Sequence, residues 1–124
     1  MGISAALFAS IRTTRICVVP YKEEVDKLIA YCEECGIDHR NVSFFVAPSD
    51  EVFPSLRVEG KLDLVLIDGG HGFPTPTIDW YYEARHLRRG GVLVVDDLQL
   101  AAVQVLDGFL AKDPRWIEIR RTAK

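Results

Sequence analysis

The chain has 124 residues, of which 48% are hydrophobic and 27% charged, a composition typical of one small globular domain with a buried core. Its formal net charge of −3 and its lack of a basic stripe argue against nucleic acid as the partner. Three cysteines, no secretory pattern and no long apolar run predict a cytoplasmic protein with reduced thiols and no membrane contact.

Hydrophobic periodicity predicts strands that alternate with helices. In chain order we expect a helix over 4–10, a strand over 15–19, a helix over 22–35, a strand over 42–46, a short helix or turn over 49–56, a strand over 62–67, a helix over 77–87, a strand over 92–95, a helix over 98–112 and a strand over 116–120. Such an alternation favours an α/β domain with a parallel sheet between helices. The continuous apolar runs LVLI and VLVV are typical of strands buried on both faces.

Two of the predicted strands end in acidic residues. The run LVLIDGGHGFPTP places Asp68 after one strand, and GGVLVVDD places Asp96 and Asp97 after the next. Ligands bind at the carboxyl ends of the strands in open parallel sheets, so we expect these carboxylates along one rim. Three neighbouring carboxylates need a cation or a proton to relieve their repulsion, and oxygen ligands favour Mg²⁺. The three aspartates are therefore candidate Mg²⁺ ligands. The alternative for Asp97 is a cap on the following helix.

A histidine follows the glycine pair of the first run. His71 is a candidate general base, because an imidazole titrates near neutral pH. The alternative is a loop histidine that only makes hydrogen bonds. Gly69 and Gly70 give the backbone freedom to turn and allow a ligand to approach closely.

The segment DLVLIDGGHGFPTPTIDWYYEARHLRRGGVLVVDD resembles the second half of a class I S-adenosylmethionine-dependent methyltransferase. It is most similar to the small bacterial O-methyltransferases with an IDGGH or IDGDH fourth strand and a GG-LVVDD fifth strand. The resemblance runs from about Gly2 to Ile119. It implies a Rossmann-like, three-layer α/β/α fold, S-adenosylmethionine as cofactor and O-methylation of a small-molecule acceptor.

The resemblance also implies roles for individual residues. In metal-dependent members of the group, Mg²⁺ is held at positions matched here by Asp68, Asp96 and Asp97. Asp68 and His71 match catalytic positions, with His71 as the base. The residues matched to cofactor contacts are Gly2, Ser4, Ser49, Asp50, Asp68 and Gly69.

The chain departs from the family pattern at its N-terminal end. The family's first strand and glycine loop are lacking, and only Gly2–Ser4 resembles the end of that loop. Val19 stands where the family has an acid that holds the ribose hydroxyls. We therefore expect residues 1–124 to form a single, N-terminally truncated methyltransferase-like domain, with an open sheet edge that favours a homo-oligomer.

Two alternative functions stay open at this point. One is a non-catalytic remnant, or a half-domain that needs a partner chain. The other is a phosphoacceptor receiver-like domain, which is disfavoured because the acidic pair comes late and no lysine follows the strand over 92–95.

Overall fold

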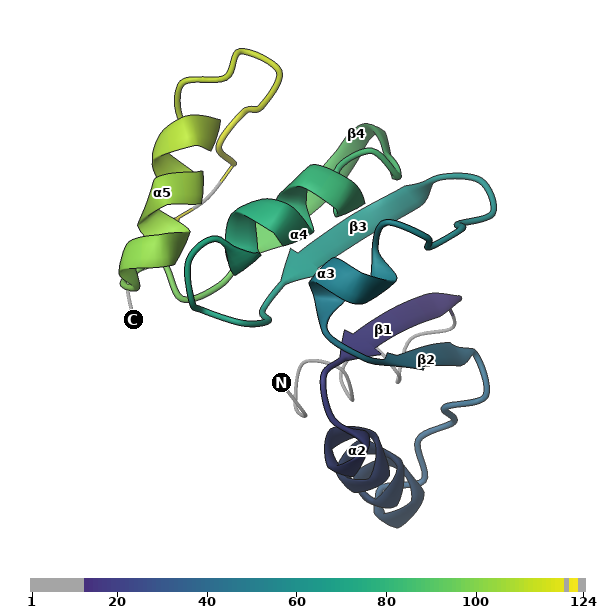
Figure 1. The fold of residues 1–124 in the computed structure, drawn as a ribbon. Helices are drawn as coiled ribbons and strands as arrows, with labels where there is room; N and C mark the ends of the chain where they lie inside the picture. The colour runs from purple at the N-terminus through teal and green to yellow at the C-terminus, as the bar shows by residue number, and fades with distance from the viewer. Residues whose placement is uncertain (1–12, 120, 123–124) are drawn as a thin grey trace. The chain divides into compact units, whose positions relative to one another are not determined.

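A computed structural model describes residues 13–119, 121 and 122. Its elements in chain order are β1 (Arg15–Val19), α2 (Lys22–Glu34), β2 (Val42–Val46), α3 (Ser49–Val52), β3 (Leu62–Ile67), α4 (Thr75–Glu83), β4 (Leu87–Val95) and α5 (Ala101–Leu110) (Figure 1). The predicted alternation of strands and helices is thus confirmed, and the strands pair in parallel, as in a partial Rossmann-like fold. The helix expected over 4–10 lies outside the described residues. Among the described residues, no helix combines the length and the apolar character needed to cross a bilayer.

The chain divides into two compact units, Met1–Glu59 and Gly60–Lys124. In the first unit, β1 and β2 pair in parallel, with Val19 opposite Val46 at the carboxyl end. Helix α2 packs on this pair through Leu28 and the fully buried Cys32, and Phe44 of β2 lies against them. The amphipathic pattern of the helix therefore supplies the core of the first unit.

In the second unit, β3 and β4 also pair in parallel, with Ile67 opposite Val95 at the carboxyl ends. The backbone N–H of Asp96 donates to the carbonyl oxygen of Ile67 at 3.0 Å, which extends the pairing by one step. Asp68 and Asp96 consequently leave the sheet at the same edge. This register is the structural basis of the candidate site.

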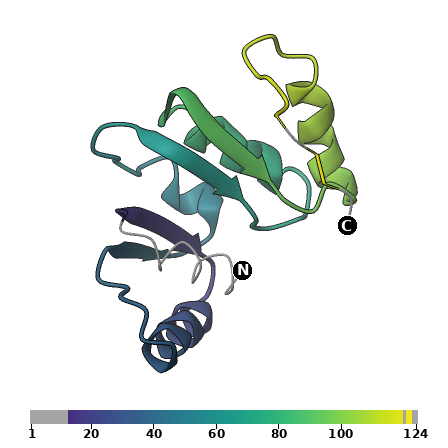
Figure 2. The ribbon, with the colours of Figure 1, turned by 180° about the vertical axis from the view of Figure 1, so that it is seen from behind.

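One face of the β3–β4 pair is covered by α4 and α5. Helix α4 lies in front of the strands in Figure 1 and behind them in Figure 2. The core between these layers contains Val65, Ile67, Trp80, Leu93, Val95, Leu106 and Leu110. On the opposite face, Leu64, Val92 and Val94 are each 39% exposed. We expected these strands to be buried on both faces. Among the described residues of the second unit, only the face toward the helices is buried.

The boundary between α4 and β4 differs from the prediction. The helix ends at Glu83 rather than at residue 87, and β4 begins at Leu87 rather than at residue 92. The reason is pairing at the start of β3, since the N–H of Leu62 donates to the carbonyl oxygen of His86 at 2.7 Å. Gly90, with φ of 74°, allows the irregular register that follows.

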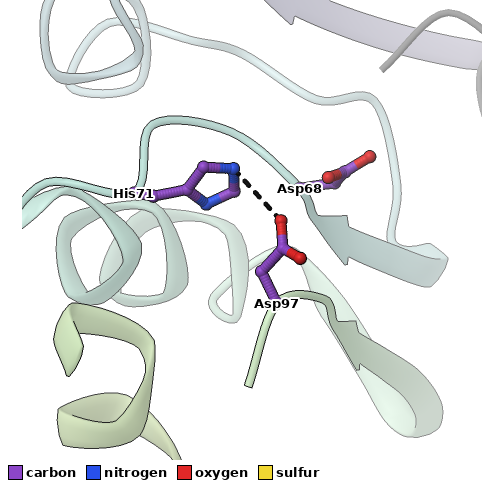
Figure 3. A group of neighbouring side chains, drawn as sticks. All are labelled: Asp68, His71 and Asp97. Carbon is purple, nitrogen blue, oxygen red and sulfur yellow. Dashed lines mark ion pairs between the residues drawn. The ribbon is translucent and has the colours of Figure 1, made fainter. Parts of the chain in front are cut away.

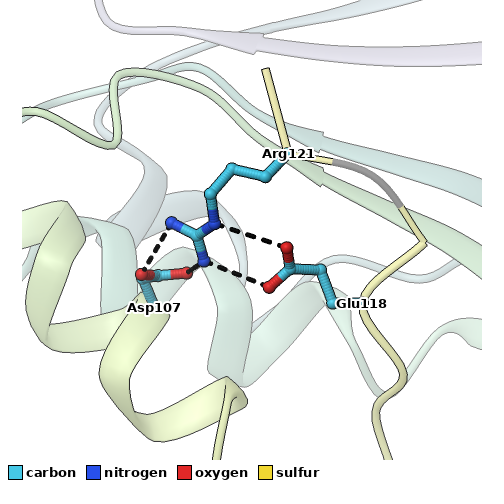
Figure 4. Close-up of polar contacts among 3 residues, drawn as sticks. All are labelled: Asp107, Glu118 and Arg121. Carbon is cyan, nitrogen blue, oxygen red and sulfur yellow. Dashed lines mark hydrogen bonds and ion pairs between the residues drawn. The ribbon is translucent and has the colours of Figure 1, made fainter. Parts of the chain in front are cut away.

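The strand predicted over 116–120 is wrong for residues 116–119, which are not in a strand. Ile117 and Ile119 are 86% and 83% exposed. The chain after them is tied to α5 by side chains, because Arg121 donates to Asp107 at 2.8 Å and to Glu118 at 3.2 Å (Figure 4). The alternation of apolar residues in this segment does not produce a strand, because no strand among the described residues pairs with it.

Candidate active site

Three side chains meet at the carboxyl ends of β3 and β4. Each of Asp68, His71 and Asp97 offers one potential ligand atom, and these atoms all lie within 4.8 Å of one another. Figure 3 shows the His71 imidazole and the Asp97 carboxylate directed toward each other, with Nε2 3.2 Å from Oδ2. The side chains of this pair are 41% and 20% exposed, and Asp68 is half-buried. A ligand can therefore reach the group from solvent.

Asp97 is held by its neighbours on both sides of its carboxylate. Its Oδ1 accepts a hydrogen bond of 2.8 Å from Nε2 of Gln99, which leaves Oδ2 directed at His71. Its backbone has φ of 55°, a left-handed conformation that aspartate tolerates better than most side chains. The alternative role as a helix cap is wrong, since α5 begins at Ala101 and its N-cap is Leu100. The left-handed residue instead separates β4 from the helix.

Asp96 lies next in the chain but does not belong to this group of three. Its Oδ1 accepts the backbone N–H of Asp97 at 2.7 Å. The donor set that the structure brings together is thus two carboxylates and an imidazole, where the sequence suggested three carboxylates. Carboxylate oxygens suit Mg²⁺, while an added imidazole nitrogen suits Mn²⁺ or Zn²⁺ as well.

The two glycines between Asp68 and His71 press against α4. A Cβ atom added to Gly69 would lie 3.2 Å from Oδ2 of Asp79, and one added to Gly70 would lie 3.1 Å from Cγ2 of Thr75. Gly72, beyond the histidine, has nothing within 4 Å of the same position. Close approach to the helix therefore accounts for the first two glycines of the loop, and not for the third.

Behind this loop lies a pair of acids that the sequence reasoning missed. Asp79 is only 5% exposed, and Glu83 follows it one helical turn later on the same face of α4. Burial and then the negative charge of Asp79 raise the pKa of Glu83 to about 8. The sequence TPTIDWYYE does place these two acids four residues apart. Acids at this spacing are common on exposed helix faces, so the spacing alone did not indicate burial.

The other predicted cofactor residues lie elsewhere. Ser49 and Asp50 begin α3 in the first unit, where Ser49 is half-buried and Asp50 exposed. Gly2 and Ser4 lie outside the described residues. Val19 ends β1 and is 5% exposed, so an apolar side chain is buried where the resemblance calls for a carboxylate.

A sequence family described as a methyltransferase domain matches residues 1–98. The match includes all four described strands and ends just after Asp97, so the three clustered side chains fall within it. No curated protein matches the chain.

Proposed function

Because the chain belongs to this methyltransferase-domain family, we propose that it is an S-adenosylmethionine-dependent O-methyltransferase that acts on a small-molecule hydroxyl group. Family membership implies S-adenosylmethionine as the methyl donor. The observation that carries the finer proposal is the 3.2 Å approach of His71 Nε2 to Asp97 Oδ2, beside Asp68 at the carboxyl ends of two parallel strands. An imidazole paired with a carboxylate is a suitable acceptor for the proton of a hydroxyl group.

The proposed reaction assigns a step to each side chain. S-adenosylmethionine, when bound, would supply the methyl group, and the electrons of its carbon–sulfur bond would remain on the sulfur as the acceptor oxygen takes the methyl carbon. The hydroxyl proton passes to His71. In the neutral tautomer that carries its proton on Nε2, 3.2 Å from Oδ2 of Asp97, Nδ1 is the nitrogen that accepts this proton, and the Asp97 carboxylate stabilises the resulting imidazolium. Asp68 helps to orient the reactants, which supplies rate by fixing their approach.

The residues present fit the methyl donor in part. Within the first unit, Ser49 and Asp50 carry a hydroxyl and a carboxylate suited to an adenine. Within the second unit, Asp68 offers a half-buried carboxylate, while Gly69 lies against Asp79 of α4. Val19 does not fit, because an isopropyl group cannot accept hydrogen bonds from ribose hydroxyls. We therefore expect weak cofactor binding by the isolated chain.

We further propose Mg²⁺ as an optional second cofactor, held by Asp68 and Asp97. A bound divalent ion lowers the pKa of a coordinated hydroxyl group. Asp96 is not part of this cluster, and its Oδ1 accepts the backbone N–H of Asp97. Magnesium titration followed by calorimetry, with Asp68→Asn beside the unaltered chain, tests this assignment.

The direct test is calorimetric titration with S-adenosylmethionine, with and without Mg²⁺, followed by measurement of S-adenosylhomocysteine formed with catechols and other hydroxylated acceptors. His71→Ala should abolish turnover while it leaves the fold intact. His86→Ala is the matched control, because His86 is half-buried in the turn before β4 and is not part of the cluster. Absence of binding heat under both conditions would remove the enzymatic proposal for this chain.

A second candidate is a half-domain that needs a partner chain, such as a second copy of itself. The supporting observation is that the described strands form two separate two-stranded sheets, so each strand has one unpaired edge. Unpaired edges favour association through added strands. Light scattering across a range of concentrations distinguishes the candidates, because a monomer that binds S-adenosylmethionine contradicts the half-domain.

A further inference from the structure

Asp79 has an unusual position for a charged residue. It is 5% exposed, and within the described part of the chain it is the only polar or charged residue that is buried to this degree. Removing a carboxylate from water costs free energy that its surroundings must offset. The position of this buried acid, next to the loop of the candidate site, is therefore a reason to ask what it does there.

The carboxylate of Asp79 lies directly behind the loop that carries the candidate active-site residues. Its Oδ2 stands 3.2 Å from where a Cβ atom on Gly69 would be. Gly69 directly follows Asp68 in the chain and precedes His71 by two residues. The backbone at Gly69 therefore connects the two functional side chains.

We propose that Asp79 is a positioning residue whose buried carboxylate supports the loop from Asp68 to His71 in the geometry that the active site needs. The effect on catalysis that this inference implies rests on the proposed methyltransferase function. The contact between Asp79 and the loop does not depend on that function. Gly69 is the complementary half of the contact, because a Cβ atom there would lie 3.2 Å from Oδ2 of Asp79, and the buried carboxylate would have to move by a few tenths of an ångström.

Glu83 makes this arrangement tolerable near neutral pH. Its pKa is raised to about 8 by burial and by the charge of Asp79. Near pH 7 Glu83 is therefore mostly protonated and adds little negative charge beside Asp79.

A double-mutant cycle tests the contact without any assay of activity. Gly69→Ala should lower the unfolding temperature measurably, and the loss should shrink in the Asp79→Ala background because the colliding carboxylate is gone. Gly69 does not have a left-handed φ, so alanine adds steric contact without backbone strain. Gly72→Ala is the matched control, since nothing lies within 4 Å of its added methyl group.

A second measurement asks whether the contact reaches His71. The side-chain NMR signals of His71 should shift in Asp79→Ala, shift less in the size-matched Asp79→Asn, and stay unchanged in Glu83→Gln at pH 7. In an active preparation, Asp79→Ala should also lower kcat/KM on the order of tenfold, because a displaced loop misplaces the base. If Asp79→Ala fails to fold, the cycle is run with Asp79→Ser, which also lacks the terminal oxygen next to Gly69, and the spectra are taken with Asp79→Asn.

The outcomes separate the two proposals. Equal losses from Gly69→Ala in both backgrounds, or unmoved His71 signals in every Asp79 variant, overturn the positioning role even if the enzyme is active. A nonzero coupling with shifted His71 signals supports it even if no methyl transfer is found, and in that case only the proposed function fails.

Discussion

The side chains of His71 and Asp97 meet across the ends of two neighbouring parallel strands, with Nε2 of the first 3.2 Å from Oδ2 of the second. Twenty-five residues of sequence separate them, and the pairing of Ile67 with Val95 brings them together. Gln99 fixes the second oxygen of Asp97, so the carboxylate has little freedom to turn away from the imidazole. The pair is thus oriented before any ligand arrives.

Asp97→Asn tests whether this orientation matters for chemistry. The amide keeps the shape of the side chain but removes the charge that stabilises an imidazolium, and positioned acid–base groups contribute about 10²- to 10⁴-fold to rates. We therefore expect a fall in kcat on the order of 10²-fold, measured as S-adenosylhomocysteine formation. Asp63→Asn is the control, since Asp63 is an exposed acid of β3 that pairs with Arg88. Equal rates in Asp97→Asn and the unaltered chain would remove Asp97 from the mechanism.

The core beneath the site provides a prediction about stability. Leu106 is 1% exposed and packs against Val65 and Ile67. Leu106→Ala should lower the free energy of unfolding by about 2–5 kcal/mol, because it removes buried methyl groups and leaves a cavity. Val105→Ala on the same helix should cost about 0.5 kcal/mol or less, since Val105 is 54% exposed. Urea unfolding of both variants measures the difference, and similar losses would show that α5 does not pack as described.

The strands and the site illustrate what the sequence could and could not establish. The strands over 15–19, 42–46 and 62–67 match the prediction because a short apolar run with turn residues at both ends leaves few alternatives. The edge shared by Asp68 and Asp97 was also expected, because it follows from parallel pairing alone. The assignment of these residues to catalysis and metal binding stays a prediction.

The remaining features depend on contacts that the local pattern does not encode. The left-handed backbone of Asp97 and the bond from its N–H to Asp96 decide which acid joins the cluster. The burial of the Asp79 side chain depends on how closely the loop at Gly69 approaches α4. The residues over 116–119 have a strand-like alternation, yet an alternating pattern forms a strand only where a neighbouring strand accepts it.

The tie between the C-terminal segment and α5 should contribute little to stability. Arg121 pairs with Asp107 and Glu118, but these three side chains are 45%, 30% and 57% exposed. Exposed ion pairs contribute little to stability, so Arg121→Ala should lower the free energy of unfolding only slightly, and the loss should shrink at high salt. Arg115→Ala is the control, because its ion pair within the described residues is with the nearby Asp113. A large loss that does not depend on salt would contradict this prediction.

Glu83 makes the stability of the second unit depend on pH. Its pKa in the folded chain is about 8, against an ordinary value of 4.5, because burial and the charge of Asp79 disfavour its ionised form. The folded state therefore keeps a proton that the unfolded state releases between these values. The stabilisation is complete below about pH 4.5 and is lost progressively as the pH rises to about 8, at no more than about 1.4 kcal/mol per pH unit.

Urea unfolding between pH 5.5 and 8.5 measures this slope. Glu83→Gln cannot ionise, so we expect a flatter profile and a relative gain in stability at the alkaline end. Glu59→Gln, an exposed acid outside α4, should keep the slope of the unaltered chain. An unchanged slope in Glu83→Gln would show that another group causes the pH dependence.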